Sequence, residues 1–170
     1  LKPDLQRPYA KVLVVTMDTR QLEINIEGGV EDPKPLTGNR GAGRIPRDPE
    51  ILSRIVGAFN GAFKTTHGAY GMMVNKRMLL PPKQDAATVV ITDNHQVGLG
   101  TWKTNDQIPS SLLSFRQNLE PLVEDGKLNP SGRLQWGYQL AGTSVMTERS
   151  GICVTKEGYF LYLWGDDVSG

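Results

Sequence analysis

The sequence predicts a β-rich α+β fold, a mixed sheet built from successive hairpins with few short helices. Three observations support this prediction. Short apolar runs rich in Val, Ile and Thr recur along the 170 residues. Turn-forming residues separate these runs, and the chain holds 19 Gly and 11 Pro. At this length we expect a single domain, residues 1–170, with enough residues to bury a sizeable core.

The N-terminal part predicts a hairpin followed by an irregular loop. Residues 9–17 are mostly apolar and rich in β-branched side chains, whereas residues 21–27 alternate polar and apolar side chains, as a half-exposed strand does. A turn at residues 18–20 would join them. Residues 30–46 hold three prolines and three glycines and therefore predict no regular structure. Three arginines in or just after this stretch could gather around an anion, although a solvated loop is the favoured interpretation: Arg40, Arg44 and Arg47.

A short helix is predicted to follow this loop. Asp48 is a good N-cap, Pro49 suits the first helical position, and Glu50 places an acid in the first turn. Its end is predicted at Gly57, which lies within the apolar run that follows. Three apolar residues would form its buried face: Ile51, Leu52 and Ile55.

The run 56–59 then predicts a buried strand that ends in Asn60-Gly61. This dipeptide tolerates the positive φ angles of a sharp turn, and such a turn would expose the amide of Asn60 with both its donor and its acceptor usable. A plain hairpin turn is the commoner use of Asn-Gly and stays the favoured interpretation on local pattern alone. The loop 64–71 that follows is rich in small and polar residues and contains His67.

The remainder of the chain predicts further hairpins. Residues 103–119 give no readable pattern. Residues 166–170 resemble the start of another element, with Ser169 as a helix cap, so we expect the domain to continue beyond residue 170. With the opening hairpin, at least four strand–turn–strand units are expected, and the later three are 72–74 with 78–80, 88–92 with 97–102, and 150–155 with 159–164. A strand at 122–123 followed by a turn at 124–127 is also expected.

Composition narrows the classes of function. The net charge of +1 gives no global attraction to nucleic acid or to an acidic membrane, and no apolar run approaches the roughly 20 residues of a membrane span. The single cysteine, Cys153, lies in an apolar run and is interpreted as a small buried hydrophobe rather than a catalytic thiol. No metal-ligating motif is present, so neither a metal nor another cofactor is expected.

Several polar residues are candidates for chemistry, and each has a plainer alternative. Arg149 directly precedes an apolar strand. Its guanidinium could bind the oxygens of a carboxylate or a phosphate ligand, and the plainer alternative is a surface ion pair. Asp125 is followed by glycine and is most simply part of a turn. Asp166 and Asp167 could be two solvated carboxylates, ligands of a metal ion, or a carboxylate that acts as a general acid or base. His95 is interpreted as a solvated turn residue, whereas His67 stays open.

Four stretches, taken in order, resemble the phosphodiester glycosidase domain family. This is the family of the enzyme that uncovers mannose 6-phosphate by removing N-acetylglucosamine, and of many bacterial relatives. Residues 58–63 are similar to its Asn-Gly-Gly-Phe signature, with Ala62 in place of one glycine, and residues 14–22 fit its first hairpin. The family's later Leu-Asp-Gly-Gly-Gly-Ser segment is not found. The other similar stretches are 117–127, 149–158 and 166–170, of which 151–153 read Gly-Ile-Cys instead of Ala-Ile-Gly.

The resemblance implies a hydrolase that cleaves a sugar-1-phosphodiester or a related glycosidic bond in cell-surface glycans. It implies an extracytoplasmic location (secreted, periplasmic or cell-surface), a carbohydrate or sugar-phosphate substrate, no nucleic acid, and a second chain or C-terminal segment that completes the domain. A non-catalytic glycan-binding or envelope-assembly module is the alternative, and a purely structural β-domain is a third. The implied site combines catalytic Arg149, Asp166 and Asn60 with substrate-binding Gly61, His67 and Asp125.

Overall fold

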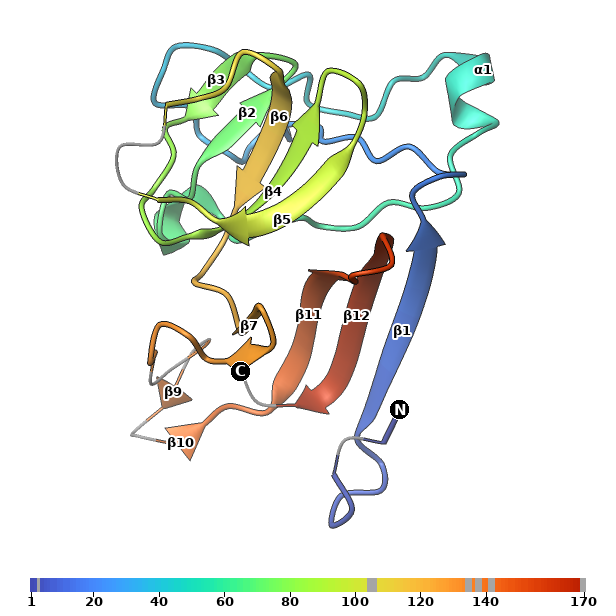
Figure 1. Cartoon of the computed structure of the whole chain (residues 1–170), viewed down its shortest axis with the longest axis vertical. Helices are drawn as coiled ribbons and strands as arrows, with labels where there is room; N and C mark the ends of the chain where they lie inside the picture. Colours follow the sequence, from blue (N-terminus) through green and yellow to red (C-terminus); the bar gives the residue numbers. More distant parts are fainter. Residues whose placement is uncertain (3, 104–106, 134–135, 137–138, 141–142, 169–170) are drawn as a thin grey trace. The chain divides into compact units, whose positions relative to one another are not determined.

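Antiparallel strand pairing dominates the computed structural model of the chain (Figure 1). The structure describes residues 1–170 except 3, 104–106, 134–135, 137–138, 141–142 and 169–170. The described residues form twelve strands, one α-helix and one 3-10 helix, which confirms the predicted β-rich fold with few short helices. None of the helices in this part of the chain is both long and apolar enough to cross a membrane. The residues group into two compact units, residues 1–23 with 129–170 and residues 24–128.

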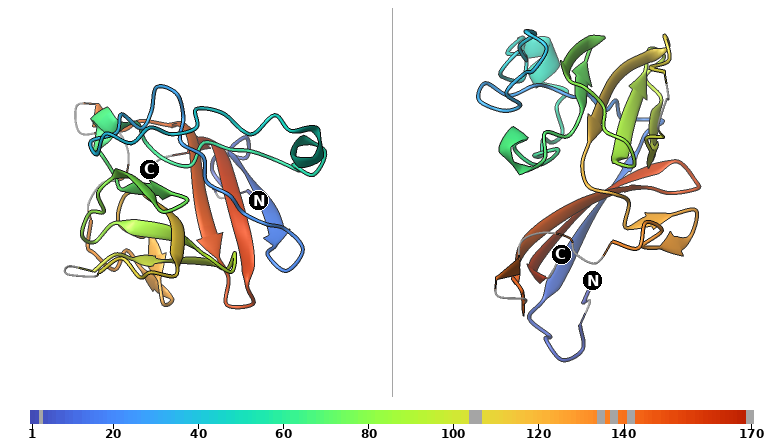
Figure 2. Two further views of the ribbon diagram at one scale, coloured as in Figure 1. Left: turned by 90° about the horizontal axis from the view of Figure 1, so that it is seen from above. Right: turned by 90° about the vertical axis from the view of Figure 1, so that its left-hand side faces the viewer.

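The first unit is built on a three-stranded antiparallel sheet. Strand β12 (Tyr159–Val168) lies between β1 (Lys11–Asp18) and β11 (Thr147–Val154), and Figure 2 shows the same order by colour. The hairpin of β11 and β12 agrees with the prediction, with Gly158 at φ 87° in its turn. A small two-stranded sheet joins β9 (Gln139–Leu140) and β10 (Thr143–Ser144).

The second unit holds a five-stranded antiparallel sheet and a small hairpin. The sheet has the order β3-β2-β6-β4-β5, and β6 lies in the second half of the stretch 103–119, which gave no pattern in the sequence. The small hairpin pairs β7 with β8. The bounds are β2 Met72–Val74, β3 Arg77–Leu80, β4 Ala87–Thr92, β5 Val97–Thr101, β6 Leu112–Gln117, β7 Val123–Glu124 and β8 Lys127–Leu128.

The core of the second unit lies on both faces of its sheet. Phe115 of β6 is fully buried with Met73 and Leu112, and the ring of Trp102 lies 5.2 Å from the ring of Phe115. A second cluster joins β2 to β3. Because Asn75 and Lys76 both have positive φ, the turn between β2 and β3 matches the right-handed twist of the strands.

Two expected strands are wrong. Residues 21–27 form no strand, since β1 pairs along its whole length with β12 instead. Their side chains still alternate between exposed and partly buried, so the sequence pattern predicted the exposure correctly but did not identify the strand that pairs with β1. Residues 56–59 also form no strand, and all four are exposed. Neither Asn60 nor Gly61 has a positive φ, so the predicted turn geometry is absent there.

The short helix is confirmed at its start and wrong at its end. Helix α1 (Pro49–Leu52) is capped by Asp48, whose Oδ1 accepts from the backbone N–H groups of Glu50 at 2.8 Å and Ile51 at 3.4 Å. It ends at Ser53 rather than at Gly57, and none of its residues is buried. In the part of the chain that the structure describes, the three residues of the predicted buried face are exposed instead: Ile51, Leu52 and Ile55.

The C-terminal stretch continues a strand instead of approaching a helix. Asp166, Asp167 and Val168 are the last residues of β12, in which Asp166 pairs with Lys11 of β1 and Val168 with Thr147 of β11. The predicted cap, Ser169, lies outside the described residues. The expected single domain that continues beyond residue 170 stays a prediction.

Candidate functional site

The loop 63–71 of the second unit is held by one arginine that the sequence did not single out. Arg116 of β6 donates through Nη1 to the carbonyl oxygens of Tyr70 at 2.6 Å and Gly71 at 3.3 Å. Its Nη2 donates to the carbonyl oxygen of Phe63 at 2.8 Å. The guanidinium thus joins the first residue of the loop to its last two, and fixes both ends of the loop on a central strand.

The next residue, Gln117, ties the same loop to the start of the following strand. Its Oε1 accepts from the N–H groups of Gly71 at 3.1 Å and Lys83 at 2.6 Å. Its Nε2 donates to the carbonyl oxygen of Lys83 at 3.0 Å and to Oγ1 of Thr88 at 2.9 Å. The side chain is completely buried, and these four contacts use its full set of strong donors and acceptors on both ends of the amide.

The carboxylate of Asp32 accepts a hydrogen bond from the same loop, and nearby cations lower its pKa. Asp32 Oδ1 accepts from the N–H of Thr65 at 2.9 Å, and this hydrogen bond is the main cause that lowers the pKa of Asp32. Lys64 and Lys34 lower it further. Burial lowers the pKa of Arg116 to about 10, against the opposing attraction of Asp32. Arg116 stays cationic at neutral pH, so the loop is fixed by a largely desolvated positive charge.

Three of the sequence-predicted site residues lie in or just before this loop. His67 closes the 3-10 helix η1 (Thr65–His67) and is exposed. Asn60 and Gly61 are exposed too, and Asn60 Oδ1 accepts from the N–H of Ala62 at 3.5 Å. On the far side of the loop, Lys83 Nζ donates to the carbonyl oxygen of Gly68 and lies 5.3 Å from the centre of the Tyr70 ring. The loop is therefore a fixed backbone with polar and cationic side chains exposed on it.

Asp125 is a turn residue in the same unit. It has φ 50° and, with Gly126 at φ 77°, forms the turn between β7 and β8. Its neighbour Glu124 is engaged with β5, because Glu124 Oε1 accepts from the N–H of Thr101 at 2.9 Å and from its hydroxyl at 2.6 Å. The carboxylate of Asp125 is left exposed by this arrangement.

Arg149 and Asp166 belong to the first unit, at a β-bulge between β11 and β12. The register places Arg149 opposite Gly165 and Thr147 opposite Val168, so two residues of β12 face a single residue of β11. One of the two, Asp167, has φ 56°. Arg149 donates through Nη2 to the carbonyl oxygen of Val145 at 3.2 Å, and its buried Nε has no hydrogen-bond partner among the described residues.

The register also sets the direction of these two side chains. Paired residues of antiparallel strands point to the same face, and successive residues alternate. Arg149 therefore shares a face with its partner Gly165, whereas Asp166, paired with Lys11, shares the opposite face with Trp164. Asp166 is exposed. The structure brings Arg149 and Asp166 to neighbouring positions of one sheet, but to its opposite faces.

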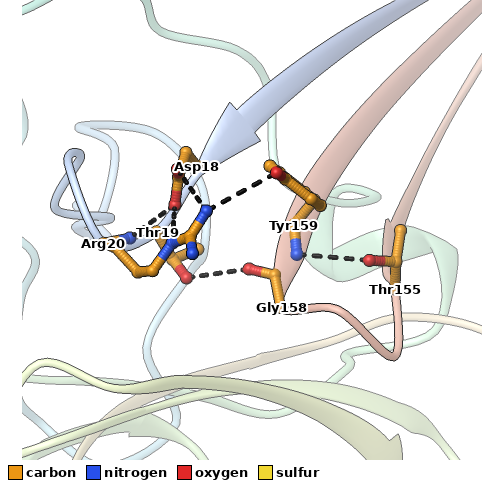
Figure 3. A network of polar contacts seen from close by, with 6 residues as sticks. All are labelled: Asp18, Thr19, Arg20, Thr155, Gly158 and Tyr159. Carbon is orange, nitrogen blue, oxygen red and sulfur yellow. Dashed lines mark hydrogen bonds and ion pairs between the residues drawn. The ribbon is translucent and has the colours of Figure 1, made fainter.

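A separate polar network at the other end of this sheet is structural (Figure 3). Arg20 binds the carboxylate of Asp18 through Nε and Nη2, both at 2.8 Å, and lies over the ring of Tyr159. These contacts lower the pKa of Asp18 and raise that of Arg20. Thr19 donates to the carbonyl oxygen of Gly158 at 2.9 Å, which joins the end of β1 to the β11–β12 turn.

A cavity of about 310 Å³ in the second unit involves none of the predicted site residues. It lies between the β2–β3 hairpin and the segment that precedes β6, and Lys76 donates across it to the carbonyl oxygen of Ser110 at 3.1 Å. Within the described residues, no group of three or more His, Cys, Asp or Glu side chains is arranged to hold a metal ion.

Comparison with known proteins identified no similar protein. No protein-family model, no curated protein and no solved structure matches this chain. The candidate site is therefore defined by its geometry alone.

Proposed function

We propose that this protein is a hydrolase that cleaves a sugar-1-phosphodiester or a related glycosidic bond in cell-surface glycans, in an extracytoplasmic location. The proposal starts from the ordered resemblance of the sequence to the phosphodiester glycosidase domain. The observation that carries it further is the loop 63–71, which begins at the last of the signature residues, Phe63, and is fixed at both ends by Arg116.

A fixed, cationic loop suits an anionic sugar phosphate. Catalysis of this kind depends on donors and charges that are already in place before the substrate binds, because reorganising them would cost part of the binding energy. Lys64 and His67 are exposed on the loop, and the backbone that presents them is held by Arg116 and Gln117. Phosphate oxygens would meet positive charge and N–H donors without any rearrangement of the backbone.

The proposed roles follow the chemistry of the bond. Cleavage at the anomeric carbon needs a clamp for the phosphate charge and a carboxylate to handle protons. Following the resemblance, we assign the clamp to Arg149, whose buried Nε has no hydrogen-bond acceptor among the described residues, and the carboxylate to Asp166. Asn60 with the N–H of Gly61 orients sugar or phosphate oxygens. His67 and Asp125 are auxiliary substrate contacts.

Sugar release from an N-acetylglucosamine-1-phosphate diester tests this proposal in the longest native form of the protein. We expect turnover in the wild type, a loss of at least about a hundredfold in Arg149→Ala and in Asn60→Ala, and an unchanged melting temperature in both. Arg20→Ala is the matched control: it removes an exposed arginine from the turn that follows β1, in the unit that carries Arg149, and it should keep its activity. If the wild-type protein releases no sugar, the proposed hydrolase activity is refuted.

A non-catalytic glycan-binding module is the second candidate, and one observation favours it. Arg149 and Asp166 point to opposite faces of their sheet, so a single substrate in contact with one face would meet only one of them. Calorimetric binding of the same diester without sugar release would select this candidate. An Arg149→Ala variant that loses stability together with activity would instead make Arg149 a structural residue.

A further inference from the structure

The segment 40–64 is exposed to an extent that is unusual for its composition. Every residue from 44 to 61 is exposed, including several large apolar side chains. Val56 is 78% exposed and Leu52 46% exposed. Single exposed apolar residues are normal on a protein surface, whereas larger apolar patches mark interaction surfaces, and the exposed apolar side chains of this segment follow one another closely along the chain. The other exposed apolar members are Ile45, Ile51, Ile55, Phe59 and Phe63.

The same segment concentrates positive charge. Between residues 40 and 64 five Arg or Lys residues stand against two acids, a net charge of +3, whereas the whole chain carries +1 and the rest is therefore −2. The carboxylate of Asp48 is engaged by the N–H groups at the start of α1. None of the ion pairs in the described part of the chain involves this segment. Its charge is thus available to an anionic partner: Arg40, Arg44, Arg47, Arg54 and Lys64.

The shape of the segment favours a lipid surface over a folded protein. Helix α1 is four residues long, and Figure 1 shows irregular chain on both sides of it, so the segment offers no long face for another helix or strand. The cavity of this unit lies elsewhere, between the β2–β3 hairpin and the stretch before β6. A bilayer interface needs no matching shape: it accepts apolar side chains among its acyl chains and attracts the interleaved cations to its headgroups.

We infer that the segment 40–64 docks the protein peripherally on an anionic lipid surface. The apolar side chains around α1 enter the headgroup region, and Arg44, Arg47 and Arg54 contact lipid phosphates. This inference does not depend on the proposed hydrolase activity, since the side chains that it places on the lipid, those around α1 together with Arg44, Arg47 and Arg54, have no role in that activity.

Vesicle co-sedimentation tests the inference with the full chain. We expect binding to vesicles of phosphatidylcholine mixed with phosphatidylglycerol, weak binding to phosphatidylcholine alone, and release at high salt. The double variant Arg47→Glu/Arg54→Glu should bind the mixed vesicles at least about tenfold more weakly. The double variant Leu52→Ser/Val56→Ser should lose binding to a similar degree.

Matched controls come from the β7–β8 hairpin of the same unit. Lys127→Glu reverses an exposed charge, and Leu128→Ser removes an apolar side chain that is 81% exposed. Both should bind like the wild type. All these side chains are exposed, so the variants should fold normally, which circular dichroism would verify. Absence of sedimentation, equal loss in the controls, or a dimer in solution that the Leu52→Ser/Val56→Ser variant dissolves would each overturn the inference.

Discussion

The polar contacts of Gln117 give the sharpest test of how the site loop is held. Gln117→Ala removes an amide that is fully buried and bonded to two backbone N–H groups, one carbonyl and one hydroxyl. The N–H groups belong to Gly71 and Lys83. With the amide gone, the N–H of Gly71 would stay buried without a partner, the N–H of Lys83 would lose a part-buried hydrogen bond, and the missing side-chain atoms would leave a void.

The expected loss of stability follows from these contacts. An unsatisfied buried donor costs about 1–3 kcal/mol, so two donors together with the void give about 3–5 kcal/mol for Gln117→Ala. Gln117→Met keeps most of the volume and loses the same hydrogen bonds, so it should recover only the part that comes from the void, about 1–2 kcal/mol. Losses of this size are a large fraction of the total stability of most domains.

Chemical denaturation of the two variants measures these losses. Gln96→Ala is the matched control, because Gln96 lies exposed beside the β4–β5 turn and should change stability by less than about 0.5 kcal/mol. Hydrogen exchange in Gln117→Ala should in addition speed up, relative to the wild type, more in the loop 63–71 than in the β4–β5 hairpin. A loss below about 1 kcal/mol in Gln117→Ala, or unchanged exchange of the loop, would refute the reasoning.

Three further outcomes are expected. Phe115→Ala should lose about 3–5 kcal/mol of unfolding free energy in a denaturant titration, since the ring is fully buried in the core of the five-stranded sheet; a loss under 1 kcal/mol would contradict that placement. Gly71→Ala should lower the melting temperature, because a Cβ there would lie 2.5 Å from Gln117 Oε1 and 2.7 Å from a backbone carbon, whereas Gly57→Ala, with open space around it, should not. Asp18→Asn should flatten the acid limb of stability: the folded pKa of Asp18 lies below its ordinary 3.8, so its carboxylate stabilises the fold above that value and loses this effect as pH falls through the folded pKa. An unchanged acid limb in Asp18→Asn would show that its contacts with Arg20 do not form in solution.

Local signals predicted the hairpins of this chain well. The turns at Asn75-Lys76, Asp125-Gly126 and Gly158 all have the positive φ that turn-forming residues accept. The first and the last join two strands where the sequence placed them, whereas at Asp125-Gly126 the sequence placed the turn and the strand before it but not β8. The start of α1 followed from its cap for the same reason. In these cases the residues that decide the structure are neighbours in sequence, so the sequence alone contains the evidence.

The wrong elements are those that depend on distant partners. Residues 21–27 alternate as a strand would, yet β1 takes β12 as its partner, and Lys11 pairs with Asp166 across most of the chain. Residues 56–59 are apolar and form no strand, because no ladder is available to them within the described structure. An apolar pattern states that a segment prefers burial, but it does not state which backbone will pair with it.

The same limit applies to the candidate site. His67 and Asn60 were found because glycine-rich loops and Asn-Gly pairs are visible in the sequence, whereas Arg116 and Gln117 act on a backbone about 46 residues away. Their one visible signal is position: two long polar side chains end the apolar strand β6, at a point where a further apolar residue would be expected. A polar pair that ends a central strand must find buried partners or destabilise it. Loops that lie elsewhere in the sequence and are rich in glycine are the natural source of such partners, because their backbone N–H and carbonyl groups are not used by a ladder. The search for functional loops in a sequence of this kind should therefore begin from the polar ends of its core strands as well as from the loops themselves.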